Sequence, residues 1–262
     1  MTEKNIEQSI SDSLETSSYM LPYLPYLLQD LWALGSSVEI ILKVIEELEL
    51  SKITNVLDLG CGKGAVSIQI ASRLGFHVTG IDAMEPFLRD AIRKAEEFNV
   101  SNLCEFIKVD ILNYTLNKHN FDIVILASLC GVLGSLRNTI ARLRMQVKNN
   151  GCIIIDDGYL KQSDHLNRKG YEHCLNYQQT LNELISFGDV LLKEINTDDV
   201  SLGINEEYTA LIKKRGEELI ASNPEMKDEI SNYIRGQEEE CKFLENEIGG
   251  AVWVLRKKIT AL

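Results

Sequence analysis

Three glycines at alternate positions interrupt the segment 56–64, VLDLGCGKG, immediately after a run of apolar residues. Glycine at Gly60, Gly62 and Gly64 allows the positive φ angles of a sharp turn and lets a ligand approach the main chain. A stretch with helical character, residues 65–74, follows at once, and the N-terminus of a helix offers unpaired N–H groups to a ligand. This spacing predicts a site for an anionic or nucleotide-like ligand.

Acidic residues follow the next two apolar segments. Asp82 ends the segment VTGID, and a carboxylate at that position can accept hydrogen bonds from ribose hydroxyl groups. Asp110 lies in VDIL, where it can accept a hydrogen bond from an adenine amino group while Ile111 packs on the ring. Parallel sheets bind ligands beyond the carboxyl ends of their strands, so we expect these groups to lie near the glycine turn.

The glycines alone leave the ligand undecided. Gly60, Gly62 and Ala65 also satisfy the G-x-G-x-x-G/A pattern of dinucleotide-binding proteins, so NAD and S-adenosylmethionine are both compatible with the spacing. Asp58 precedes the turn, and its negative charge would repel a pyrophosphate and attract a sulfonium or an ammonium group. Asp58 therefore favours S-adenosylmethionine.

Five segments together resemble a known family. VLDLGCGKG, VTGID, VDIL, FDIVILAS and NNGCIIIDD occur in the order and at the spacing of the class I S-adenosylmethionine-dependent methyltransferases, over roughly residues 50–160. The resemblance implies an α/β, Rossmann-like, doubly wound sheet of seven strands that is mostly parallel and has an antiparallel C-terminal strand. It implies S-adenosylmethionine as the cofactor and methyl transfer as the reaction, and it does not specify the acceptor.

The resemblance also implies a role for each residue that matches the family's motifs. The glycine turn would line the amino-acid end of the cofactor, the second segment its ribose, the third its adenine and the fourth its methyl group. The residues implied to bind the cofactor are Asp58, Gly60, Cys61, Gly62, Asp82, Ala83, Met84, Asp110, Ile111, Ala127, Ser128 and Leu129. For Met84 and Ile111, packing in the core is an open alternative.

The acceptor is expected to be a small molecule. The Asn-Pro-Pro-Tyr stretch that marks amino-group methylation of nucleobases and glutamine is absent, and Ser128, Leu129, Cys130 and Gly131 stand in its place. The candidates for the acceptor side are Tyr19, Tyr23, Trp32, Asp157 and Tyr159. No catalytic base is identified. An NAD-dependent oxidoreductase and a non-catalytic S-adenosylmethionine-binding protein remain alternatives.

The elements that must position these residues alternate along the chain. We predict strands at 55–59, 77–81, 104–109, 121–127, 152–156, 190–195 and 251–257, with helices between them. Two helices are expected at 22–34 and 37–49, and residues 1–49 are interpreted as an N-terminal helical cap segment. Residues 50–262 would form the methyltransferase domain, with a helical insertion at 204–247 that is either a lid or a solvated excursion.

Composition excludes several other classes. The chain of 262 residues has a net charge of −12, which disfavours binding to nucleic acid or to an anionic membrane. The apolar run at 19–34 is too short to span a membrane and contains two prolines and an aspartate. The six cysteines form no CxxC pair and the spacing of His165 and His173 is no metal pattern, so we expect reduced thiols, a cytoplasmic location and no metal. The sequence does not predict the oligomeric state.

Overall fold

A seven-stranded sheet forms the centre of the protein in a computed structural model, which describes residues 10–11, 16–51, 53–129, 131–162, 168 and 170–258. The strand order is β3-β2-β1-β4-β5-β7-β6. All neighbouring strands pair in parallel except β7, which is antiparallel to both β5 and β6. The strands are β1 (Asn55–Leu59), β2 (His77–Asp82), β3 (Cys104–Lys108), β4 (Phe121–Ala127), β5 (Val147–Leu160), β6 (Val190–Asn196) and β7 (Ile248–Arg256). The expected fold class is confirmed.

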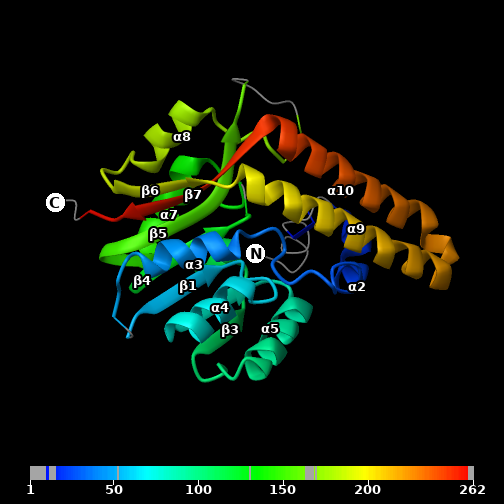
Figure 1. Ribbon diagram of the computed structural model, residues 1–262, viewed down its shortest axis with the longest axis horizontal. Helices are drawn as coiled ribbons and strands as arrows, with labels where there is room; N and C mark the ends of the chain where they lie inside the picture. Colours follow the sequence, from blue (N-terminus) through cyan, green and yellow to red (C-terminus); the bar gives the residue numbers. More distant parts are fainter. Residues whose placement is uncertain are drawn as a thin grey trace.

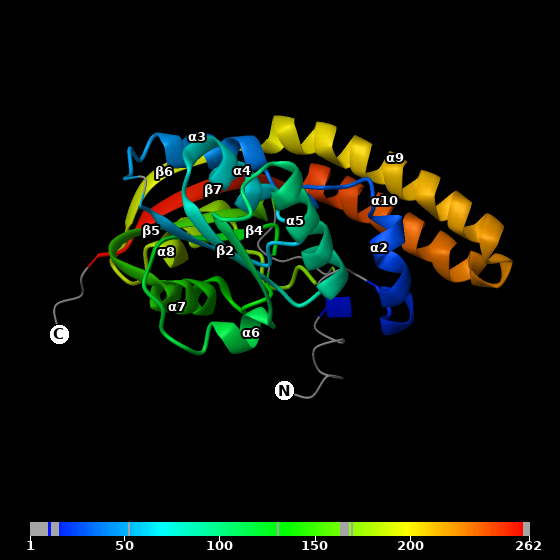
Figure 2. The ribbon, with the colours of Figure 1, turned by 90° about the horizontal axis from the view of Figure 1, so that it is seen from below.

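Helices cover both faces of the sheet, as Figures 1 and 2 show. The apolar side chains of β4 alternate between two cores, because successive residues of a strand point to opposite faces. Ile123 and Ile125 pack with α3 and α4, whereas Val124 and Leu126 pack with α7 and α8. The helices are α2 (Leu24–Leu27), α3 (Val38–Glu46), α4 (Ala65–Leu74), α5 (Glu85–Glu97), α6 (Ile111–Tyr114), α7 (Leu136–Gln146), α8 (Tyr177–Leu184), α9 (Asp198–Ser222) and α10 (Lys227–Glu247), with 3₁₀ turns at Ser18–Tyr23 and Pro224–Met226.

Several predicted elements differ from the structure: β5 begins at Val147 and not at residue 152, and β7 begins at Ile248 and not at residue 251. The helix expected at 22–34 is reduced to a 3₁₀ turn and the single turn of α2, because Pro22 and Pro25 lack the N–H that a longer helix requires. β5 was expected to end at Asp156 and instead continues to Leu160, since residues 157–160 pair with the first residues of β7. That pairing joins segments about ninety residues apart and leaves no local signal in the sequence.

The helical insertion is a long hairpin of α9 and α10 that begins at Asp198, earlier than the predicted residue 204. Both helices extend beyond the end of the sheet, and α2 lies against them (Figures 1 and 2). Leu24, Leu27 and Leu28 join Ile212 and Ile230 in a third apolar cluster. The insertion is therefore packed against the N-terminal segment and is not a purely solvated excursion. The division into domains at residue 49 stays a prediction.

Polar contacts reinforce this packing between the N-terminal segment and the hairpin. Arg215 donates from Nε to Asp30 Oδ2 at 2.6 Å, and the Tyr26 hydroxyl donates to Glu218 Oε2 at 2.9 Å. These groups are exposed or half-buried, so they contribute less than the leucines beneath them.

Two glycines of the hairpin provide a matched test of how closely its helices approach. A methyl group at Gly216 of α9 would collide with Ile234 of α10, whereas one at Gly236 would meet nothing within 4 Å. Gly236→Ala should raise the free energy of unfolding by roughly 0.5–1 kcal/mol, because alanine loses less backbone entropy in a helix. Gly216→Ala should raise the free energy of unfolding by less than this, or lower it. The same entropic benefit is opposed there by the collision of the new methyl group with Ile234. Urea denaturation measures both; equal gains would contradict the close packing of the two helices.

Candidate functional site

Eleven of the twelve residues predicted to bind a cofactor line one cavity of about 150 Å³. It lies at the carboxyl ends of β1, β2 and β4, and we call it the glycine-turn cavity. The eleven are Gly60, Cys61, Gly62, Asp82, Ala83, Met84, Asp110, Ile111, Ala127, Ser128 and Leu129. The structure therefore brings together residues that span seventy positions of the sequence. Their role as ligands of a cofactor stays a prediction.

The glycine turn requires glycine at both positions that line the cavity. Gly60 and Gly62 have φ angles of +68° and +52°, in the left-handed region that side chains rarely adopt. A Cβ at Gly60 would collide with Leu129, and one at Gly62 would stand 2.8 Å from Cδ1 of Leu34. These two leucine side chains cover the turn and form part of the cavity wall.

Asp82 holds the turn against the end of β2. Its carboxylate accepts hydrogen bonds from the Gly62 N–H at 2.9 Å and from the Met84 N–H at 2.7 Å. Burial raises the pKa of this carboxyl above its ordinary value, and the backbone hydrogen bonds oppose that shift. Each carboxylate oxygen has two accepting positions, so Asp82 can hold the turn and still accept from a ligand.

Asp110 caps the short helix α6, accepting from the Leu112 N–H at 2.9 Å and from Nδ2 of Asn113 at 3.2 Å. Ile111 both lines the glycine-turn cavity and belongs to the core formed by α7 and α8. Met84 likewise lines the cavity and packs in the cluster that contains α2. These two residues therefore pack in a core and also line the cavity, and their contact with a ligand stays a prediction.

Asp58 is the predicted cofactor residue that does not line the cavity. Its side chain is 2% exposed and points to α4, where the Ser67 hydroxyl donates to Oδ2 at 2.6 Å. Burial raises the pKa of Asp58 to about 6, with the nearby charge of Asp82 acting in the same direction. In the structure this carboxyl group is bound to Ser67 of α4 and does not reach the cavity, and the expected contact of Asp58 with a ligand stays a prediction.

Lys63 is a residue of the turn that the sequence analysis did not single out. It is 2% exposed, its ammonium group donates to the main-chain oxygen of Leu28, and its Nζ lies 4.0 Å from Asp90 Oδ2. The indole N–H of Trp32 donates in return to the Lys63 main-chain oxygen at 3.0 Å. Burial lowers the pKa of Lys63 to about 8. The position of Lys63 between Gly62 and Gly64 was the feature of the sequence that could have indicated a contact with the N-terminal segment.

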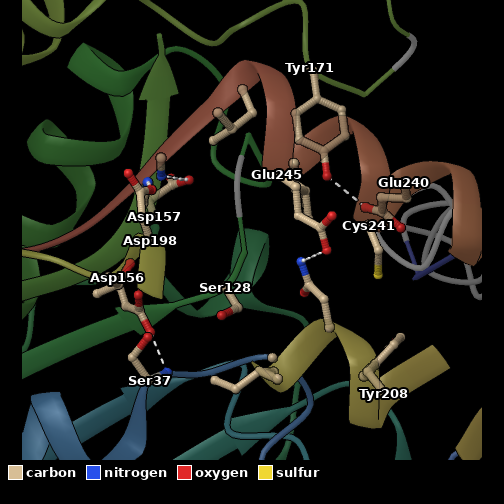
Figure 3. Close-up of a pocket in the computed structure, with 18 of the residues that line it drawn as sticks. Ser37, Ser128, Asp156, Asp157, Tyr171, Asp198, Tyr208, Glu240, Cys241 and Glu245 are labelled. Carbon is tan, nitrogen blue, oxygen red and sulfur yellow. Dashed lines mark hydrogen bonds between the residues drawn. The ribbon is translucent and has the colours of Figure 1, made fainter. Parts of the chain in front are cut away.

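A second cavity of about 300 Å³ adjoins the first, and Leu34 and Ser128 line both. Its walls come from the loop that precedes α3, the end of β5, the start of β7 and the hairpin (Figure 3). Because its lining includes Asp156, Asp157, Glu240 and Glu245, we call it the acidic cavity. Ser128, at the shared wall, has a φ of +54°, and its N–H donates to the main-chain oxygen of Asp156 at 2.9 Å.

Asp156 is the most deeply buried of these acids. It is 6% exposed, and its Oδ2 accepts from the Ser37 N–H at 2.6 Å. Burial raises the pKa of Asp156 to about 7, and the charge of Asp157 adds to the shift. A carboxyl group with this pKa can take up and release a proton near neutral pH.

Of the five residues predicted on the acceptor side, Asp157 lines the acidic cavity, and the other four line neither cavity. Tyr159 packs against Trp253 of β7, with ring centres 6.4 Å apart. Trp32 packs against Phe98, with ring centres 5.3 Å apart. The remaining two, Tyr19 and Tyr23, pack against each other in the N-terminal segment, with ring centres 6.5 Å apart.

The hairpin, expected as either a lid or a solvated excursion, contributes to the wall of this cavity. Tyr208 of α9 and Glu240 and Glu245 of α10 lie on its wall (Figure 3). The sequence shows many acidic residues in this insertion, but only its folding back over the strand ends identifies which of them line the cavity.

Other kinds of site find little support in the described part of the chain. Among those residues, no group of three or more His, Cys, Asp or Glu side chains is placed to hold a metal ion. His173 packs against Gly131, whereas Cys130 and His165 lie outside the described residues. None of the described helices combines the length and the apolar character needed to cross a membrane.

Comparison with known proteins gives a consistent picture. A family model described as a methyltransferase domain matches residues 50–240. The uncharacterised protein YjhP of Escherichia coli (strain K12) is 31% identical over 109 residues, which are 42% of this chain and 44% of that protein. Phosphoethanolamine N-methyltransferase of Plasmodium falciparum is 23% identical over 173 residues, 65% of this chain and 64% of that protein. The matched part is thus under two thirds of these relatives' length.

Solved structures share the fold. A methyltransferase from Thiobacillus denitrificans, solved in complex with S-adenosylhomocysteine, has a TM-score of 0.76 at 20% identity and covers 90% of this chain and 98% of its own. The structure of YjhP has a TM-score of 0.73 at 19% identity, and the match covers 86% of this chain and 94% of YjhP. At these identities the likeness establishes the fold alone.

The buried acids should make stability depend on pH. Asp58 and Asp156 have folded-state pKa values of about 6 and about 7, above the ordinary value of 3.8. The folded protein therefore retains protons that the unfolded chain has released, so the free energy of unfolding should fall as the pH rises from about 4 to about 7. Asp156→Asn should reduce this fall and stabilise the protein at pH 8 by up to about 4 kcal/mol. Urea denaturation at pH 5 and pH 8 measures the effect, with Asp228→Asn as an exposed control; an unchanged pH profile in Asp156→Asn would contradict it.

Removing the ammonium group of Lys63 should loosen the N-terminal segment. Lys63→Met keeps much of the side-chain length but loses the hydrogen bond to Leu28, worth about 1.5–3 kcal/mol for a charged donor. We expect faster hydrogen exchange at residues 24–32, measured by mass spectrometry, while exchange in β1 and β4 stays slow. The exposed Lys43→Met of α3 serves as the control. Equal protection of residues 24–32 in both variants would show that Lys63 does not hold this segment.

Proposed function

Because the chain belongs to the methyltransferase-domain family, whose model matches residues 50–240, we propose that it binds S-adenosylmethionine and transfers a methyl group to a small-molecule acceptor. One observation carries this proposal. The glycine-turn cavity, lined by the predicted cofactor residues, adjoins the acidic cavity through Leu34 and Ser128. Methyl transfer requires donor and acceptor side by side, and these two cavities supply adjacent sites.

The residues of the glycine-turn cavity fit the parts of the cofactor. Asp82 would accept from the ribose hydroxyl groups, and Asp110 from the adenine amino group, with Ile111 and Met84 against the ring. The glycine turn would lie along the amino-acid end. Leu34 and Leu129 cover the turn, so a ligand that lies against Gly60 and Gly62 requires their side chains to turn aside.

The protein's part in the reaction is mainly to align the reactants and to exclude water. When bound, the cofactor supplies an activated methyl group on a sulfonium. Both cavities share the wall around Ser128, and the acceptor atom would face that methyl group there. A base is needed only if the acceptor must lose a proton, and Asp156, a buried carboxyl group that lines the acidic cavity, would perform that step.

The alternatives are distinguishable. An NAD-dependent oxidoreductase would bind a dinucleotide in the same cavity, and a non-catalytic protein would bind S-adenosylmethionine without transferring its methyl group. The net charge of −12 supports a partner other than nucleic acid. None of the five described cysteines is in a disulfide, which supports the proposed cytoplasmic location.

Titration calorimetry with S-adenosylhomocysteine, S-adenosylmethionine and NAD tests the cofactor. The first two should bind and NAD should not. Asp82→Ala should weaken S-adenosylhomocysteine binding by at least about tenfold, because a charged hydrogen-bond acceptor is lost. Asp228→Ala, an exposed substitution on α10, should leave the affinity unchanged.

Asp82 also holds Gly62, so its loss can disturb the turn itself. A thermal melt of Asp82→Ala checks folding, and Asp82→Asn, which retains one accepting oxygen, should show a smaller loss of affinity. An unchanged affinity in Asp82→Ala would mean that the ribose assignment is wrong. Binding of NAD without S-adenosylhomocysteine would refute the proposed activity.

A further inference from the structure

The lining of the acidic cavity is strongly unbalanced in charge. Its described lining residues include five carboxylates and a single ammonium group: Asp156, Asp157, Asp198, Glu240, Glu245 and Lys161. Nζ of Lys161 lies 3.8 Å from Asp198 and donates to the main-chain oxygen of Glu245 at 3.0 Å. The ammonium group thus already has partners on α9 and α10, and the net charge of the lining is negative.

The carboxylates stand on opposite sides of the cavity (Figure 3). Asp156 and Asp157 come from β5, beside Ser128 and the shared wall, whereas Glu240 and Glu245 come from α10. Neutral donors orient the α10 side: the Tyr171 hydroxyl donates to Glu240 at 2.6 Å and Nδ2 of Asn205 lies 3.5 Å from Oε1 of Glu245. A molecule between the two sides would face carboxylate oxygens at both ends.

From this arrangement we propose that the acceptor is a small molecule with an aliphatic amine, bound as its ammonium form in the acidic cavity with that nitrogen at the Asp156 side. The inference rests on the proposed function, since it names the acceptor of the same site. Carboxylates at the two walls would attract the cation and hydrogen-bond it, as charge-assisted hydrogen bonds do.

The position of Asp156 also accounts for the proton that an ammonium acceptor must lose. The Asp156 carboxylate takes one proton from the ammonium group, which leaves a neutral amine with a free electron pair. The nitrogen then forms a bond to the methyl carbon as the carbon–sulfur bond breaks, and the sulfur keeps the electron pair of that bond. The product is a methylated ammonium and S-adenosylhomocysteine, and the proton on Asp156 passes to water.

The charge of the cavity separates this acceptor from those named for the relatives. A phosphorylated amine, as in the name of the Plasmodium falciparum relative, would bring a phosphate dianion among these carboxylates. A sterol, as named for a relative from Gibberella zeae, has no charge to match them. The cavity of this chain therefore fits an unphosphorylated amine better than either.

Binding to the protein loaded with S-adenosylhomocysteine tests the acceptor class directly. The probes are sets of three fragments with one carbon skeleton each: the primary amine, the alcohol and the carboxylic acid. Calorimetry at pH 7 should show amines binding at least about tenfold more tightly than the matched alcohols, and the acids more weakly still. The affinity for the amines should also fall as the salt concentration rises.

Variants locate the binding to this cavity. Asp157→Asn and Glu245→Gln should each lower the affinity for the amine probes by about three- to tenfold while leaving S-adenosylhomocysteine binding unchanged. Glu229→Gln, on an exposed position of α10 outside the cavity, is the matched control and should bind as the unaltered protein does. Asp156→Asn should bind amines but transfer labelled methyl groups to them slowly, with the rise in rate between pH 6 and pH 8 lost.

Each outcome decides between the two proposals. If S-adenosylhomocysteine binds but the alcohols or the acids bind as tightly as the amines, or no amine binds at millimolar concentration, the amine acceptor is wrong and the methyltransferase proposal stands. If the amines bind and Asp157→Asn and Glu245→Gln match Glu229→Gln, the cavity assignment is wrong. Failure of S-adenosylhomocysteine to bind would overturn the proposed function and the inference with it.

Discussion

The hydrogen bond between the Gly62 N–H and the Asp82 carboxylate is the contact on which the rest of the site depends. It joins the turn after β1 to the end of β2, and the Cys61 N–H strengthens the junction by donating to Ile81 at 2.9 Å. With the turn fixed, α4 begins at Ala65 and Lys63 is directed toward Leu28. The conformation of this turn thereby forms one side of the glycine-turn cavity and, through Lys63, holds the N-terminal segment in place.

Parts of this fold could be predicted from the sequence because their signals are local. β1, α4 and β4 have the expected bounds, since an apolar run, a glycine turn and a helical pattern follow one another within a few residues. The glycine-turn cavity could be located because residues at neighbouring strand ends must meet. The side to which Asp58 turns, toward Ser67 of α4, could not be predicted, because adjacent residues of a strand face opposite sides and a sequence does not state which side meets the cavity. The packing of Tyr159 on Trp253 depends on a strand about ninety residues away, which leaves no local signal.

The acidic cavity could not be predicted for a different reason. Its walls come from segments as far apart as Ser37, Asp157 and Glu245, and the α9–α10 hairpin has to fold back over the strand ends before these meet. The hairpin is placed in turn by its packing against α2, which links the chain's first described helix to its last two. The negative charge of this cavity therefore depends on tertiary structure. The acidic residues of the hairpin become part of the cavity wall only after the hairpin has packed in place.

The third apolar cluster has a consequence for how the chain is made. Leu27 is synthesised early, but its partners Ile212 and Ile230 follow nearly two hundred residues later. At typical rates of translation the N-terminal segment waits on the order of 10–40 s before the hairpin leaves the ribosome. During that interval only part of the cluster, including Met84 and Phe87, is available to cover its leucines, and the site above the glycine turn is completed only once the hairpin has been made.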